Sequence, residues 1–148
     1  MTVGINWSPK NPDYEKVVRE GFAAEAPLKA IGATLEKVEP GYVEIHVPIQ
    51  PAIMTSYAPV VHGGIVGMLA DCALAHAALT LAAPGAMGVT VEYKINLMAP
   101  TAGERVIARG TVIKPSSRMT VAKADIYAAG ADGSERLVAM AVGTLAAL

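Results

Sequence analysis

The chain has 148 residues, of which 53% are hydrophobic, and its formal net charge at pH 7 is −1. This length suits one domain over residues 1–148, and the near-zero charge gives no indication of a nucleic-acid partner. The single cysteine excludes an intrachain disulfide and favours a reducing, cytoplasmic setting, while the high apolar content predicts an oligomer with buried interfaces.

The N-terminal third predicts one helix and two strands. Residues 1–12 are polar, so we expect no signal peptide. Asn11-Pro12 is typical of a helix start and predicts an amphipathic helix over residues 12–24. Residues 34–38 form a strand candidate. Apolar and polar residues then alternate over residues 42–49, which predicts a half-buried strand with His46 on its solvated face.

The longest apolar stretch predicts a buried central helix over residues 63–82, ended by Pro84-Gly85. A helix that is apolar on every side is normally buried. Its one carboxylate, Asp71, is costly to bury unless the group is paired or used in function. We do not expect a membrane span, because proline and glycine interrupt the stretch and the uninterrupted piece is short.

Four strand candidates follow, at residues 89–97, 105–114, 119–128 and 136–145. Short turns separate them, including the hairpin signal Asp132-Gly133. Short turns predict antiparallel pairing of successive strands. One antiparallel sheet with a single long helix against it is an α+β architecture.

The start of the predicted central helix carries a recognisable motif. His62-Gly63-Gly64 followed by Leu69-Ala70-Asp71 resembles the HGG-x4-LAD signature of hotdog-fold acyl-CoA thioesterases of the phenylacetate-degradation (PaaI-like) type. Residues 88–91, 96–100, 110–112 and 141–144 look like strands of that family, so the resemblance covers about residues 28–148. It implies the hotdog fold, in which an antiparallel sheet wraps around one long central helix.

The residues themselves fit thioester hydrolysis, which needs an activated water or nucleophile and donors for the developing oxyanion. A helix start offers unpaired backbone N–H groups and the positive end of the helix dipole. Gly63 and Gly64 leave that backbone open to a carbonyl oxygen, and Asp71 can serve as general base or as nucleophile.

Spacing separates these two groups. Gly63 and Asp71 are eight residues apart, which is roughly 12 Å along one helix, so one carbonyl cannot contact both in a single chain. Two such helices packed antiparallel about a two-fold axis would bring each Asp71 near the other Gly63. The resemblance implies the same arrangement, a homodimer with two composite sites, and we also consider a dimer of dimers, that is, a homotetramer.

The resemblance assigns further roles by position. Thr90 matches a hydroxyl that helps to hold the attacking water, and Ser56 stands where several relatives have an amide that contacts the thioester. His62 orients the loop or the substrate carbonyl, or it caps the helix; the sequence leaves both roles open.

A basic turn is the candidate site for the phosphates of coenzyme A, through Lys114, Ser117 and Arg118. The alternative is a solvated patch at the strand ends. Cys72 and His76 share a helix face, and we interpret them as core residues because two further metal ligands are not evident. We expect no metal and no resident cofactor, since coenzyme A enters as part of the substrate.

The sequence therefore predicts hydrolysis of an acyl-CoA thioester to the free acid and CoA. Two alternatives stay open: a non-catalytic acyl-CoA-binding module and a hotdog enoyl-CoA hydratase. Binding alone does not need a buried acid, which argues against the first. Asp71 and His76 lie about 140° apart around the helix, which argues against an Asp–His pair of the second kind.

Overall fold

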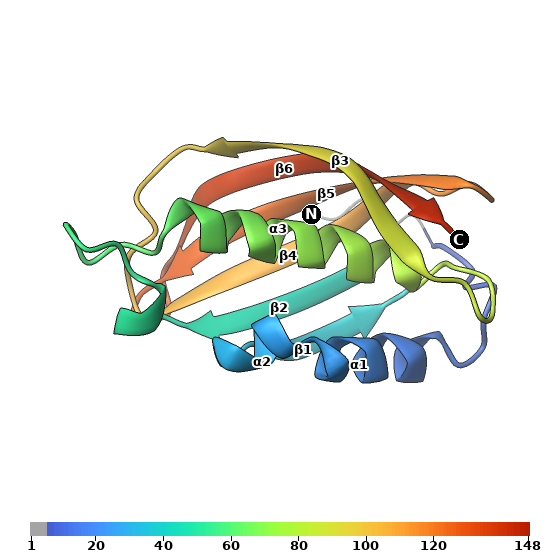
Figure 1. Ribbon diagram of the computed structural model, residues 1–148, viewed down its shortest axis with the longest axis horizontal. Coiled ribbons are helices and arrows are strands. Elements are labelled where there is room, and N and C mark those ends of the chain that lie inside the picture. Colours follow the sequence, from blue (N-terminus) through green and yellow to red (C-terminus); the bar gives the residue numbers. More distant parts are fainter. Residues whose placement is uncertain (1–5) are drawn as a thin grey trace.

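A computed structural model describes residues 6–148 of the chain. One curved antiparallel sheet wraps around the long helix α3, and two shorter helices lie beside its β1 edge (Figure 1). In chain order the elements are α1 (Tyr14–Ala24), α2 (Ala26–Ala30), β1 (Thr34–Glu39), β2 (Tyr42–Pro48), the single turn η1 (Pro51–Ile53), α3 (Gly63–Leu79), β3 (Gly88–Leu97), β4 (Arg105–Lys114), β5 (Met119–Ala129) and β6 (Glu135–Ala147).

The strand order is β1-β2-β4-β5-β6-β3. β4, β5 and β6 pair successively, as their turns predicted, but the same expectation is wrong for β3, which pairs with β6. The connection over residues 98–104 is too long for a tight hairpin. Hydrogen bonds hold this connection against β6 and against the segment before α3: Met98 N donates to Val138 O at 2.8 Å, and Val61 N donates to Thr101 O at 2.8 Å. β3 therefore forms an edge of the sheet alongside α3.

The core lies between α3 and the concave face of the sheet. Val43, Ile45 and Val47 are fully buried, as the alternation along β2 predicted. The helix packs directly on the sheet at Gly110 of β4, where an added Cβ would lie 2.1 Å from the carbonyl oxygen of Ala73. Most of α3 is buried in this way. Within residues 6–148, no helix combines the length and apolar character needed to cross a bilayer.

Two helix boundaries differ from the prediction. α1 begins at Tyr14 because Asn11 Oδ1 accepts a hydrogen bond from Asp13 N at 2.9 Å, which makes a turn before the helix. α3 ends at Leu79 because, beyond the C-cap Thr80, the amides of Leu81 and Ala82 donate to carbonyls three residues earlier. These tighter bonds replace the α-helical pattern over the last predicted turn.

Candidate active site

The lone carboxylate of α3 has one partner. Asp71 lies half-buried in the middle of the helix, and Thr90 of β3 donates a hydrogen bond from Oγ1 to Asp71 Oδ1 at 2.7 Å. No ion pair reaches Asp71 within the described part of the chain. The carboxylate is thus oriented through one oxygen, while the other is left for a ligand or water.

The start of α3 combines a cap with an unused donor. His62 Nδ1 accepts a hydrogen bond from Gly64 N at 2.9 Å, so this ring caps the helix and its neutral form carries the proton on Nε2. Ile65 N and Val66 N donate to His62 O. The N–H of Gly63 has no acceptor among residues 6–148. One N–H at the positive end of the helix dipole is therefore available.

The structure brings Thr90 to Asp71 but does not bring Gly63 to Asp71. Both lie on the continuous helix α3, so the rise per residue keeps them roughly 12 Å apart. β3 runs beside the same helix in the opposite direction. A Cβ added at Gly63 would lie 3.0 Å from Leu97 Cδ1, whereas Thr90, near the other end of β3, meets Asp71.

Apolar side chains of β3 are uncovered next to this site. Val89, Val91 and Leu97 are each about half exposed, and β3 has a strand neighbour on one side only within residues 6–148. Exposed apolar side chains on an unpaired strand edge are typical of a surface that another chain covers.

The four other residues proposed from the sequence for substrate contact lie apart from Asp71. Ser56 is exposed in the loop before α3, which Thr55 stabilises by donating from Oγ1 to Ala58 O at 2.8 Å. Lys114, Ser117 and Arg118 are exposed at the turn between β4 and β5. Ser117 lies near the C-terminal end of α3, the end opposite Gly63.

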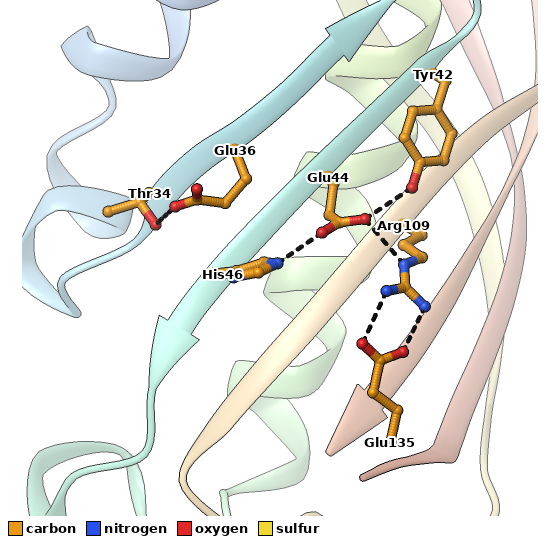
Figure 2. A network of polar contacts seen from close by, with 7 residues as sticks. All are labelled: Thr34, Glu36, Tyr42, Glu44, His46, Arg109 and Glu135. Carbon is orange, nitrogen blue, oxygen red and sulfur yellow. Dashed lines mark hydrogen bonds and ion pairs between the residues drawn. The ribbon is translucent and has the colours of Figure 1, made fainter. Parts of the chain in front are cut away.

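A second polar cluster lies on the convex face of the sheet and was missed by the sequence prediction (Figure 2). Glu44 is 7% exposed. Its carboxylate accepts hydrogen bonds from Tyr42 Oη at 2.9 Å and Arg109 Nε at 3.0 Å, and it lies 2.7 Å from His46 Nε2. Arg109 also makes a bidentate ion pair with Glu135, at 2.7 and 3.0 Å. His46 lies on the polar face of β2, as expected, but it is half-buried and pairs with Glu44 instead of being fully solvated.

Electrostatics in this convex-face cluster favour the ionised carboxylate. Burial alone would raise the pKa of Glu44, but hydrogen bonds from Arg109, His46 and Tyr42 outweigh burial and lower this pKa to about 2. The ion pair with Glu135 raises the pKa of Arg109. These side chains point away from α3 and from Asp71, so the cluster joins β2, β4 and β6 rather than serving the acid on the helix.

His76 is a core residue, as the sequence predicted, and Cys72 is half-buried against the core. His76 is 4% exposed, its Nδ1 lies 2.7 Å from Cys72 O, and its ring meets the Phe22 ring edge-on at 5.5 Å. Burial, together with the charges of Glu25 and Asp71, raises the pKa of Cys72 to about 12. Among the described residues, no three metal-ligating side chains converge.

Comparison with known proteins places the chain in a family. A family model described as Thioesterase superfamily matches residues 58–133, which hold all of α3 and the Asp71–Thr90 pair. The chain belongs to the thioesterase superfamily. This confirms the resemblance seen in the sequence, and the superfamily supports a hydrolase activity on thioesters for this member.

Individual relatives agree with this assignment. A thioesterase family protein from Silicibacter pomeroyi has a crystal structure that superposes with a TM-score of 0.88 at 38% identity, over 91% of this chain and 98% of that one. A protein from Saccharolobus solfataricus is 32% identical over 86% of this chain and 81% of its own length. Its name describes it as an esterase by inference. The E. coli PaaI protein of the phenylacetic acid degradation operon shares the fold, with a TM-score of 0.80 at 18% identity over 92% of this chain and 94% of that one. The hotdog fold is confirmed.

Proposed function

We propose that this thioesterase-superfamily protein hydrolyses an acyl-CoA thioester to a free acid and coenzyme A. The observation that supports the proposal most directly is the Asp71–Thr90 pair, a single carboxylate on a buried helix held through one oxygen at 2.7 Å. A carboxylate in such a setting is suited to taking a proton from water or to attacking a carbonyl carbon.

Two routes use the same geometry. As general base, Asp71 accepts a proton from water while the water oxygen bonds to the thioester carbon; the C–S bond then breaks, and the thiolate of coenzyme A leaves and takes up a proton. As nucleophile, Asp71 bonds to the carbon and releases the thiolate, and water then hydrolyses the resulting anhydride. In both routes Thr90 fixes the carboxylate and leaves its second oxygen to react.

We assign stabilisation of the oxyanion to the N–H of Gly63, which has no acceptor among the residues described here. Because Gly63 lies roughly 12 Å from Asp71 on the same helix, we assign it to a second subunit. Antiparallel pairing of two β3 edges would place the start of one α3 beside the middle of the other. The exposed Val89, Val91 and Leu97 would be covered in the same contact. The active unit is then a homodimer, alone or within a dimer of dimers.

The remaining contacts complete the proposed substrate site. Gly64 and Ser56 flank the thioester, and His62 holds the helix start in shape through its hydrogen bond with Gly64. The phosphates of coenzyme A bind at the β4–β5 turn, where Ser117 and the basic side chains of Lys114 and Arg118 are exposed.

The alternatives fit less well. A hydratase would need a histidine beside the acid, yet the imidazole of His76 bonds to Cys72 O and packs on Phe22 in the core. A binding module would have no use for a carboxylate that lacks an ion pair within residues 6–148.

The test is the substitution Asp71→Asn, with Glu104→Gln as a matched carboxylate-to-amide control at an exposed loop position. We expect Asp71→Asn to keep its thermal stability and its acyl-CoA binding but to lose about 10²–10⁴-fold in turnover. Glu104→Gln should behave as wild type. Near-normal thiol release by correctly folded Asp71→Asn would refute the assignment.

Complementation tests the shared site. Gly63→Pro removes the N–H, yet proline is tolerated at the first position of a helix, so the fold should persist. Mixing inactive Asp71→Asn with inactive Gly63→Pro should restore part of the activity, because each hybrid dimer carries one undamaged site. If subunits exchange and no activity returns, the two residues do not share a site across subunits.

A further inference from the structure

A cavity of about 230 Å³ opens at the C-terminal end of α3, and of the residues given a role above only Ser117 lines it. Its floor is apolar and includes the buried side chains of Ala78, Leu81 and Leu145. Its wall also carries three polar side chains from the β4–β5 turn and β5, those of Ser116, Ser117 and Thr120, together with one cation, Lys10.

The cavity is aligned with the proposed catalytic acid. Ala78 follows Asp71 by seven residues, which is two helical turns, so both lie on one face of α3 and roughly 10 Å apart along its axis. Across from the helix, Leu145 of β6 is the register partner of Thr90. The cavity and the Asp71–Thr90 pair therefore share one side of the molecule, between the same face of α3 and β6.

The backbone on either side of Lys10 is held by its neighbours, while the Lys10 side chain itself is exposed. The ring of Trp7 packs so closely on Gly41 that an added Cβ would lie 2.3 Å from Trp7 Cδ1. Asn11 is 9% exposed, and its Oδ1 accepts from Asp13 N at 2.9 Å. Prolines at positions 9 and 12 further restrict the backbone. No carboxylate lies within ion-pair distance of the Lys10 ammonium in the described chain.

An apolar floor with a cation and hydroxyls at its wall suits a ligand that is extended and ends in an anion. We propose that this cavity binds one arm of the thioester substrate and that Lys10 pairs with an anionic group at the end of that arm. The proposal rests on the proposed function, which places the reacting carbonyl at Asp71. Two parts of the substrate are extended and end in an anion: an acyl chain that ends in a carboxylate, and the arm of coenzyme A that ends in phosphates.

Four substrates distinguish these sources. Octanoyl and suberyl groups, the latter ending in a carboxylate, are each attached to coenzyme A and to N-acetylcysteamine, which lacks the nucleotide. The variants are Lys10→Gln, Lys10→Arg to restore the charge, and Lys37→Gln as a control at an exposed lysine of β1 outside the cavity.

We expect Lys10→Gln to raise KM roughly two- to fivefold with kcat unchanged, as for loss of one solvent-exposed ion pair. If KM rises for both suberyl thioesters, the anion that pairs with Lys10 is the acyl carboxylate. If KM rises for both coenzyme A esters, that anion is a phosphate of coenzyme A. Octanoyl-N-acetylcysteamine carries neither anion and should be unaffected, and Lys10→Arg should restore the wild-type KM. If Lys10→Gln changes KM no more than Lys37→Gln for all four substrates, Lys10 is not an anion contact.

The apolar floor has its own test. Ala82→Leu adds three carbons at the cavity wall and should raise KM for octanoyl-CoA more than for acetyl-CoA; an equal effect on both would show that the acyl chain does not enter. Failure of the proposed function can be distinguished from failure of the Lys10 contact, because it would appear as no turnover of any thioester by the wild type. Calorimetric titration of coenzyme A and of suberate into wild type and Lys10→Gln would still measure the anion contact, and equal affinities in both proteins would overturn it.

Discussion

Replacing Gly110 with alanine tests how closely α3 must approach the sheet. Gly110 lies on β4 beneath Ala73, and an added Cβ would lie 2.1 Å from the carbonyl oxygen and 2.6 Å from the carbonyl carbon of that residue. Ordinary contact begins near 3.4 Å, so the helix or the strand must move by more than 1 Å. The atoms in the way are backbone atoms of the central helix, which cannot turn aside as a side chain can.

Overpacking of a well-packed core typically costs about 1–3 kcal/mol. Because relief requires a shift of α3 as a whole, we expect Gly110→Ala to lower the free energy of unfolding by about 3 kcal/mol, near the upper end of that range. For a chain of this length that corresponds to a fall of roughly 6–12 °C in Tm. The same shift would move Asp71, two residues before Ala73, relative to Thr90, so kcat should fall as well.

Urea and thermal unfolding at fixed protein concentration measure this effect, since association would otherwise alter Tm. Gly21→Ala is the matched control: its added Cβ would come no nearer than 4.0 Å to Leu79 Cδ2, and it lies within α1. Better helix propensity should stabilise that variant by up to about 1 kcal/mol. If Gly110→Ala keeps wild-type stability, α3 does not depend on direct contact with β4.

Three further predictions concern other side chains. Arg109→Ala should destabilise the fold by about 2 kcal/mol at pH 7, as for loss of a hydrogen bond to a charged group. Because the pKa of Glu44 is lowered to about 2, this difference should shrink as pH falls below the ordinary value of 4.5, and a pH-independent loss in acid titrations would contradict it. With its pKa raised to about 12, the thiol of Cys72 should react with a disulfide reagent at pH 8 only after unfolding, and rapid labelling of the native protein would show that it is accessible. Thr90→Val should lower kcat about tenfold by freeing the carboxylate of Asp71, whereas Thr90→Ser should retain activity; equal losses in the two would exclude the hydroxyl as the cause.

Local patterns predicted most of the elements. The apolar run with its single Asp71 identified the central helix, and alternation along residues 42–49 identified the apolar side chains of β2 that face the core. The Asp132-Gly133 signal marked a turn in which Gly133 has a φ of 80°, a conformation that glycine adopts readily. These features depend on residues close in sequence, so a single chain carries enough information to predict them.

Long-range neighbours could not be predicted in the same way. Glu44 is opposite Arg109 in the register of β2 with β4, and this pairing joins residues 65 positions apart. Alternation placed Glu44 on a polar face but could not show that a guanidinium would cover it. The position of Lys10 depends similarly on the packing of Trp7 against Gly41. The pairing of β3 with β6 also had no local signal.

The strand order has a consequence for how the chain folds during synthesis. α3 and β3 emerge from the ribosome after β1 and β2 but before β4, β5 and β6. The second edge of β2 must wait for β4, and β3 must wait for β6, the thirteen residues Glu135–Ala147. Until then much of an apolar helix and the whole of an unpaired strand are exposed, and such surfaces promote aggregation. Pairings so distant in sequence also slow folding. We therefore expect nascent chains that stop before β6 to depend on chaperones, and folding to be completed only after the last strand is released.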